Sequence, residues 1–220
     1  MAKIILADNG ISFDGKSALL SPMGGAEKAL VSLSESLVGL GHEVLVFNNC
    51  LKNIVYKGVN WIPISKNLPD SADLYIANRG DKLINLVPKA KHRVFWIHNP
   101  ASYLMKWRYL HKLWRRRPCI VFSSNYHTQT YPSWAPAGER LIIPYGVDKI
   151  FRERKMVSNL PGPKAVFTSN PLRSLDWLLD LWSKFVFSRA PNAELHVFSG
   201  SATYGEYGKT KETIMKPILE

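Results

Sequence analysis

Short apolar runs alternate along the chain with longer runs in which apolar residues recur every three or four positions. The short runs predict strands, and the longer runs predict helices with one buried face. The predicted strands cover residues 3–7, 42–47, 60–64, 73–77, 93–97, 119–123, 141–143, 165–168 and 194–198. The predicted helices cover residues 24–40, 103–116, 174–188 and 209–220, and another begins at Asn125. This alternation predicts an α/β fold with a mostly parallel sheet that helices cover on both faces.

The segment at residues 149–163 interrupts the alternation. It is polar, has no apolar period and ends in Pro161, Gly162 and Pro163, a composition typical of a linker. The sequence therefore predicts a first domain at residues 1–148 and the beginning of a second at residues 164–220. Because one strand–helix–strand unit falls short of a whole sheet, we expect this second domain to be incomplete.

Composition narrows the class of protein. Hydrophobic residues make up 46% of the 220 residues, enough for a packed core. No apolar run reaches the ~18–20 residues of a bilayer-spanning helix, and the N-terminus reads as a strand rather than a signal peptide. Cys50 and Cys119 do not have metal-ligand spacing. We interpret them as reduced thiols of a cytoplasmic protein, with a disulfide between them left open.

Positive charge is concentrated in one stretch. The formal net charge is +12 at pH 7, and residues 82–137 contain no Asp or Glu. Such a surface attracts phosphates, nucleic acid or acidic lipid head groups. A helix through this stretch would combine flanking cations with one face made of Tyr103, Trp107, Leu110 and Trp114. That face suits an anionic membrane, or packing on the sheet, and both interpretations stay open.

The segment from Gly10 to Ser17 matches the G-x-x-x-x-G-K-[ST] pattern of nucleotide-binding P-loops, and it follows a predicted strand. A P-loop must continue into a helix whose N-terminal amides hold the phosphates. Pro22 and the pair Gly24 and Gly25 would end such a helix within two turns. No later predicted strand ends in an Asp that would hold Mg²⁺. A P-loop kinase or NTPase therefore remains only an alternative.

Other positions suit a ligand with phosphate or hydroxyl groups. Gly24 and Gly25 open the first long predicted helix, where backbone amides and the helix dipole favour an anion. His98 follows a predicted strand at its carboxyl end, the edge of an α/β sheet at which ligands bind. Arg173 lies between a predicted strand and a predicted helix, and its guanidinium suits a diphosphate. Taken singly, each is also compatible with a structural role.

Several segments carry a family resemblance when they are taken in order. They are residues 24–27 (GGAE), 37–44, 95–98 (FWIH), 143–148 (IPYGVD), 169–173 (SNPLR), 175–179 and 193–200. Together they resemble the GT-B glycosyltransferases of family 4, which are retaining enzymes that use nucleotide-activated sugars. The resemblance covers essentially the whole chain. It implies two Rossmann-like, doubly wound domains facing across a cleft, the first binding the acceptor and the second the donor.

The resemblance also implies roles for single residues. Gly24 and Gly25 match the glycine loop that approaches the donor phosphates, and His98 matches the histidine that contacts the transferred sugar or the acceptor. Asn170 and Arg173 match the donor-binding segment, with Arg173 on the diphosphate. Two departures are a tyrosine at position 145, where many relatives have Asn, and the absence of a lysine after the arginine. The family's paired glutamates would follow the last residue of this chain.

The sequence thus predicts a glycosyltransferase, or a fragment of one, that transfers a hexose-type sugar to a glycan or lipid-linked acceptor, as in polysaccharide biosynthesis. It predicts no metal and no cofactor beyond the nucleotide diphosphate sugar, because cationic groups would stabilise the departing diphosphate. The predicted location is the cytoplasm, with an anionic membrane surface contacted between Lys106 and Arg117. A non-catalytic basic module stays open as an alternative. The aromatic residues there lack the pattern of RNA-binding signatures, which argues against nucleic acid.

Overall fold

The computed structural model describes residues 1–147, 149–153, 162–200 and 211–219. The chain forms two compact units, the first made of Met1–Ser21 and Gly25–Gly146, the second of Pro22–Gly24 and Val147–Glu220. The predicted linker at residues 149–163 begins with the short helix α5 (Lys149–Arg152), and its residues 154–161 lie outside the described part. In the described residues, no helix is both long and apolar enough to cross a bilayer.

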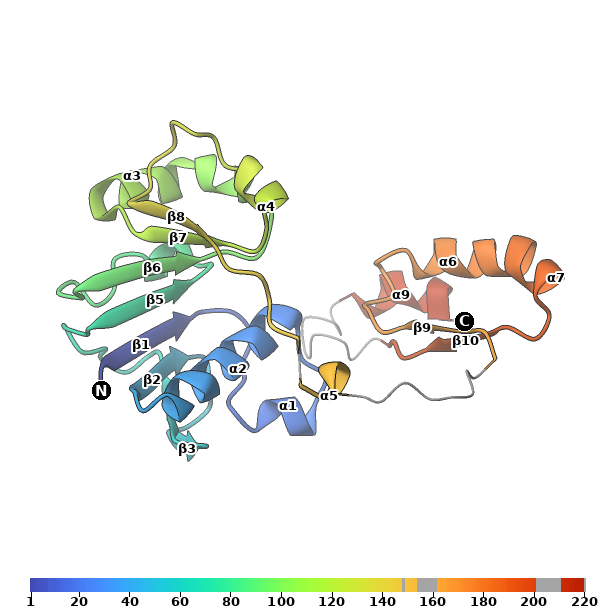
Figure 1. Ribbon diagram of the computed structural model, residues 1–220, viewed down its shortest axis with the longest axis horizontal. Helices are drawn as coiled ribbons and strands as arrows, with labels where there is room; N and C mark the ends of the chain where they lie inside the picture. Colours follow the sequence, from blue (N-terminus) through green and yellow to red (C-terminus); the bar gives the residue numbers. More distant parts are fainter. Residues whose placement is uncertain (148, 154–161, 201–210, 220) are drawn as a thin grey trace. The chain divides into compact units, whose positions relative to one another are not determined.

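An eight-stranded sheet forms the centre of the first unit (Figure 1). Its order is β3-β4-β2-β1-β5-β6-β7-β8; β3 runs antiparallel to β4, and the other pairs are parallel. The strands are β1 (Lys3–Asp8), β2 (Glu43–Asn48), β3 (Ile54–Tyr56), β4 (Val59–Pro63), β5 (Leu74–Asn78), β6 (His92–Trp96), β7 (Cys119–Phe122) and β8 (Glu139–Ile142). The chain proceeds outward from β1 in both directions, so the sheet is doubly wound with its switch point between β1 and β5. The predicted α/β, Rossmann-like fold is confirmed.

Helical segments connect these strands. They are α1 (Ser17–Leu20), α2 (Gly25–Gly39), η1 (Asp81–Leu83), η2 (Ala101–Met105), α3 (Trp107–Arg116) and α4 (Asn125–Gln129). Helix α2 packs on β2 and β4, and α4 packs on β7 and β8. Helix α2 ends as predicted, because Gly41 adopts φ +84° and donates its N–H to the carbonyl of Val38 at 2.8 Å. The N–H of His42 reaches the carbonyl of Leu37, which completes a Schellman motif.

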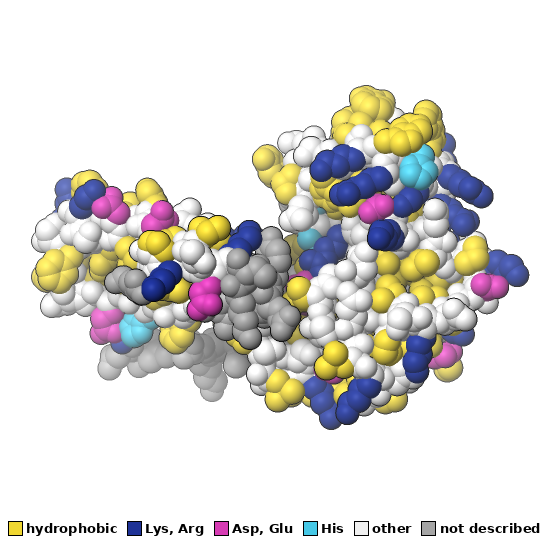
Figure 2. All heavy atoms as spheres, turned by 180° about the vertical axis from the view of Figure 1, so that it is seen from behind, with side chains coloured by type: hydrophobic (Ala, Val, Ile, Leu, Met, Phe, Trp, Pro, Cys, Tyr) yellow, Lys and Arg dark blue, Asp and Glu magenta, His cyan; other side chains and the backbone are white. Residues whose placement is uncertain are grey.

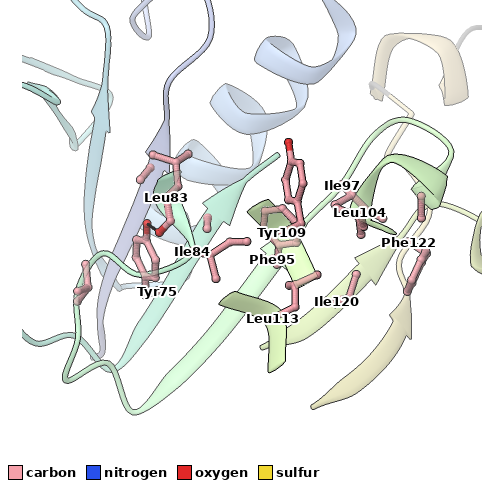
Figure 3. Packing of buried hydrophobic residues seen from close by; sticks show 14 of the residues in the cluster. Tyr75, Leu83, Ile84, Phe95, Ile97, Leu104, Tyr109, Leu113, Ile120 and Phe122 are labelled. Atoms are coloured by element: carbon pink, nitrogen blue, oxygen red, sulfur yellow. Dashed lines mark hydrogen bonds between the residues drawn. The ribbon is translucent and has the colours of Figure 1, made fainter. Parts of the chain in front are cut away.

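The core of the first unit lies around the central strands. Strand β1 is buried on both faces from Ile4 to Ala7, which explains why its sequence is a continuous apolar run rather than an alternating one. A larger cluster gathers around β5, β6 and β7, where Tyr75, Phe95 and Ile120 are fully buried (Figure 3). Leu104 and Leu113 cover it from η2 and α3. This apolar layer positions the strand ends that carry the polar residues described below.

The structure corrects two predictions about elements. The helix predicted for residues 103–116 is divided: η2 ends at Met105, Lys106 is extended with ψ 138°, and α3 begins at Trp107. The face predicted from Tyr103, Trp107, Leu110 and Trp114 therefore does not exist as one helix face. The strand β3 was not predicted, because its three residues are too few to show a period.

The second unit contains a parallel pair of strands, β9 (Lys164–Phe167) and β10 (Glu194–Val197). Between them lie α6 (Leu175–Leu181), a π-helical turn η3 (Trp182–Val186) and α7 (Phe187–Arg189), which continue one another. Helix α9 (Glu212–Leu219) follows. These elements agree with the predicted strand–helix–strand order. Residues 209, 210 and 220 of the helix predicted at 209–220 lie outside the described part. Lys211 is described, and it directly precedes α9.

Both cysteines are free thiols. Cys50 is buried, and burial together with the charge of Asp14 raises the pKa of its thiol. Burial also raises the pKa of the Cys119 thiol, helped by Glu139. The alternative of a disulfide between them is therefore wrong for this fold, and neither thiol is activated as a nucleophile.

Candidate functional site

Polar side chains gather at the carboxyl end of the sheet, beside its switch point. Asp8 is the last residue of β1, Asn78 is the last residue of β5, and the two are register partners. Both are completely buried. His98 lies two residues past the end of β6, as predicted. In doubly wound sheets the crevice at this point is where ligands bind.

Arg79 joins two carboxylates that come from elements far apart in the sequence. Its Nη2 lies 2.5 Å from Oε1 of Glu27, in the first turn of α2, and 3.2 Å from Oδ2 of Asp8. Burial acts to lower the pKa of the Arg79 guanidinium, but Asp8 and Glu27 outweigh it and the pKa is raised. Two buried carboxylates thus face one guanidinium that stays charged, and the cluster keeps an excess of negative charge.

The backbone at Arg79 is itself unusual. Arg79 adopts φ 55°, in the left-handed region that favours glycine, at a cost on the order of 1–3 kcal/mol. Its N–H donates to the carbonyl of Trp96 at 2.9 Å, and the N–H of Gly80 returns to the carbonyl of Asn78 at 2.7 Å. A Cβ at Gly10 would lie 2.6 Å from Nη2 of Arg79. In this left-handed conformation the guanidinium of Arg79 contacts both Asp8 and Glu27.

A chain of hydrogen bonds connects His98 to the buried Asp8. Nδ2 of Asn78 lies 2.5 Å from Oδ2 of Asp8, and Oδ1 of Asn78 lies 2.6 Å from Nε2 of His98. Nδ1 of His98 lies 2.6 Å from the hydroxyl of Tyr145. Because a carboxylate only accepts, the amide nitrogen of Asn78 faces Asp8 and its oxygen faces His98. Nε2 of His98 therefore carries the proton, and Nδ1 accepts from Tyr145.

His98 is neutral at pH 7. Burial, followed by the charge of Arg79, lowers the pKa of its imidazole to about 4, although Glu27 acts in the opposite direction. The ring also contacts Trp96 at a centroid distance of 4.8 Å and stacks with Tyr145 at 5.9 Å. A neutral ring held in one tautomer offers a defined acceptor at Nδ1. The partly exposed Tyr145 hydroxyl occupies the position from which a ligand hydroxyl would donate to it.

The glycine pair ahead of α2 differs in its exposure. Gly25 is the first residue of α2 and is exposed, and a Cβ built on it meets no atom within 4 Å. Gly24 is buried. The helix N-terminus favours an anion, and the carboxylate of Glu27 already lies in this first turn. No contact with a described atom requires glycine at position 25, which leaves space beside the helix start.

Asn170 and Arg173 lie in the second unit, in the turn between β9 and α6. Oδ1 of Asn170 accepts from the N–H of Leu172 at 2.8 Å, and its carbonyl accepts from the N–H of Arg173 at 2.9 Å. Asn170 is buried and shapes this turn. Arg173 is exposed, and among the described residues its side chain has no hydrogen-bond or ion-pair partner. Its guanidinium is therefore accessible.

The P-loop match at residues 10–17 has its own local explanation. Oδ1 of Asp14 accepts from the N–H groups of Lys16 at 2.8 Å and Ser17 at 3.1 Å. Helix α1 is a single turn, and Ser21 after it is extended. In a P-loop these amides would face phosphate and a long helix would follow. Here a neighbouring carboxylate occupies them, so the geometry does not favour nucleotide binding at this loop.

Sequence reasoning missed most of the cluster, namely Asp8, Glu27, Asn78 and Arg79. A signal was available for two of them, since Asp8 and Asn78 directly follow predicted apolar strands. Applying the carboxyl-end rule to every strand would have found them. The pairing of Glu27 with Arg79 spans 52 positions, and nothing in the local pattern indicates it.

A scan against protein-family models found no match, and a search of curated proteins found none. In the part of the chain that the structure describes, no group of three or more His, Cys, Asp or Glu side chains could hold a metal ion. The fold and the site together define a Rossmann-like α/β domain with a polar cluster at the switch point of its sheet.

Proposed function

We propose that the chain is a glycosyltransferase, or a fragment of one, that transfers a hexose-type sugar from a nucleotide diphosphate sugar to a glycan or lipid-linked acceptor. One observation carries the proposal: His98 is held neutral at the switch point of a Rossmann-like sheet, in a chain of hydrogen bonds that ends at Asp8. The resemblance of several segments to GT-B glycosyltransferases of family 4 supports the same conclusion.

A sugar hydroxyl is the ligand group that fits the first unit best. A sugar hydroxyl that takes the place of the Tyr145 hydroxyl would donate to Nδ1 of neutral His98. The excess negative charge of Asp8 and Glu27 around Arg79 disfavours a phosphate against this cluster. The first unit is therefore proposed to bind the acceptor or the transferred sugar, with His98 orienting a hydroxyl group.

The donor diphosphate is assigned to the accessible guanidinium of Arg173 in the second unit. In the transfer step the bond between the anomeric carbon and the diphosphate oxygen breaks, and the diphosphate leaves with the electron pair. The acceptor oxygen forms the new bond to the anomeric carbon, and its proton passes to an oxygen of the departing diphosphate. Stabilising the charge that develops on that leaving group is the main contribution of Arg173.

The test measures binding and turnover with a panel of nucleotide diphosphate sugars. Binding is followed by saturation-transfer NMR, and turnover by release of the nucleoside diphosphate. We expect His98→Ala and Arg173→Ala each to lower turnover roughly 10²–10³-fold, and Arg173→Ala to weaken donor binding. Because binding is measured alongside turnover, the outcome does not depend on catalysis by this chain alone.

Two matched controls separate these effects from loss of any histidine or arginine. His92→Ala changes an exposed histidine at the opposite end of β6, and Arg189→Ala changes an arginine at the end of α7. Both should keep donor binding and turnover. Unchanged rates in both site variants would contradict the site assignment, and a failure of every donor to bind would contradict the function.

A further inference from the structure

We propose that the outward face of α3 docks on an anionic lipid surface. The face consists of Trp107, His111 and Trp114, flanked by Arg108 and Arg115. We call it the α3 face. This inference does not depend on the proposed glycosyl transfer, because it concerns a surface away from the polar cluster and is tested without any sugar.

The packing of α3 shows which of its sides remains uncovered. Tyr109 and Leu113 are buried and face the core, whereas Trp107 and Trp114 are 70% and 65% exposed. Seven residues are about two turns of helix, so the two tryptophans lie nearly above one another. His111 lies on the same side and is fixed by a hydrogen bond from Nδ1 to the carbonyl of Trp107 at 2.6 Å. Of the four residues of the predicted face, Tyr103 packs against the core, whereas the interpretation of packing on the sheet is wrong for Trp107 and Trp114.

Two cations on the other side of α3 anchor the helix. Nζ of Lys112 lies 2.7 Å from Oδ2 of Asp81, and Nε of Arg116 donates to Oδ1 of Asn85 at 3.3 Å. Both partners lie in or just after η1, so they hold α3 in one orientation. The exposure of the tryptophans is therefore a fixed property of the fold rather than one rotation of a loosely held helix.

The charges beside the tryptophans are only partly balanced within the protein. Arg108 and Arg115 are exposed and form no salt bridge with a described residue, although Arg108 also lowers the pKa of Asp81 and lies over the ring of Tyr109 at 5.3 Å. Residues 82–137 contain no acidic side chain, and Asp81, just before them, pairs with Lys112, so the cations of α3 outnumber the acid beside them. Dark blue and yellow side chains lie next to one another around α3 in Figure 2, at the upper right. The complementary partner is an anionic surface that also accepts apolar rings.

A lipid surface meets both requirements. Indole rings favour the interface between head groups and acyl chains, and basic side chains pair with anionic lipids there. Helix α3 has 10 residues, which is about 15 Å of helix, half of the roughly 30 Å needed to span a bilayer. It can therefore lie in the plane of the interface. Single-stranded nucleic acid binds in a basic groove of a protein, where bases stack on aromatic rings, whereas the two tryptophans lie on the exposed side of a single helix.

The experiment measures co-sedimentation of the chain with lipid vesicles. One set contains phosphatidylcholine alone, and the other contains phosphatidylcholine mixed with phosphatidylglycerol. We expect binding to the anionic vesicles, weakened by salt, with a blue shift of the tryptophan fluorescence. Arg108→Gln with Arg115→Gln should weaken binding about fivefold per arginine and roughly 30-fold together. Trp107→Ala with Trp114→Ala should weaken it about tenfold or more and remove the blue shift.

Matched variants elsewhere on the chain serve as controls. Lys52→Gln with Lys66→Gln removes the same charge from two exposed positions, and Trp177→Ala removes a tryptophan that is 63% exposed in the second unit. Both controls should bind as the unchanged chain does. Three outcomes would overturn the proposal: equal binding to both kinds of vesicle, unchanged binding in both α3 variants, or binding to a short single-stranded RNA but not to vesicles.

Discussion

The pH dependence of stability gives the sharpest test of the site, because it follows from one residue. The pKa of His98 is lowered from 6.5 to about 4 by burial and by Arg79. A histidine whose pKa is lower in the folded than in the unfolded chain binds fewer protons when folded, so acid favours unfolding. Its contribution to stability is complete above about pH 6.5 and is lost as the pH falls toward 4.

The size of the effect follows from the same two values. Between about pH 7 and about pH 5, the unfolded histidine becomes protonated while folded His98 stays neutral, which costs about 2 kcal/mol of unfolding free energy. His98→Gln should remove this part of the loss, because glutamine does not titrate. Carboxylates contribute to acid unfolding in the unchanged chain and in the His98→Gln variant alike. The difference between the pH profiles of these two chains therefore isolates the contribution of His98.

Urea denaturation at both pH values measures the free energies, and an NMR titration of the imidazole Cε1 proton measures the pKa directly. His92→Gln is the control, since His92 is exposed at the other end of β6, and its profile should match that of the unchanged chain. Parallel pH profiles for His98→Gln and the unchanged chain, or titration of His98 near 6.5, would refute the reasoning about its burial and its neighbours.

Two other substitutions test the cluster and the orientation of α3. Arg79→Met leaves the buried carboxylates of Asp8 and Glu27 without their counter-ion and should lower the free energy of unfolding by about 3 kcal/mol. Adding Asp8→Asn and Glu27→Gln to the same chain should restore part of this free energy. Urea denaturation measures both effects. Leu113→Ala should cost about 2–5 kcal/mol because Leu113 is fully buried, whereas Trp114→Ala should change stability by less than about 0.5 kcal/mol. Similar losses for the two would mean that α3 is oriented differently.

Local pattern was enough for most elements of the first unit. Continuous apolar runs such as that of β1 predicted buried strands, and the helical period that stops at residue 40 predicted the end of α2, after which Gly41 adopts a left-handed conformation. Position along a strand also located His98. These features depend on neighbours within one or two turns, which is the range over which hydrophobic period and backbone preference act.

The hydrophobic pattern gave a wrong prediction where packing against neighbouring elements determines the structure. Residues 103–116 have a continuous helical period, yet the chain is extended at Lys106, and Leu104 and Leu113 on either side of this break are both buried in the core. The aromatic face expected from that period consequently consists of Trp107 and Trp114 without Tyr103, and it faces solvent. A period indicates that one face is buried, but only the packed sheet determines which face that is.

The sequence by itself determined the fold class, the positions of the main strands along the chain and the histidine at a strand's carboxyl end. Only the tertiary structure decided that Asp8 pairs in register with Asn78, 70 residues later, and that Arg79 bridges Asp8 to Glu27. Parallel strands pair across a long crossover connection, so the sheet order and its switch point arise from the packing of the entire unit. Local residue patterns therefore predict the strands, while the environment that makes His98 neutral exists only once those strands are assembled.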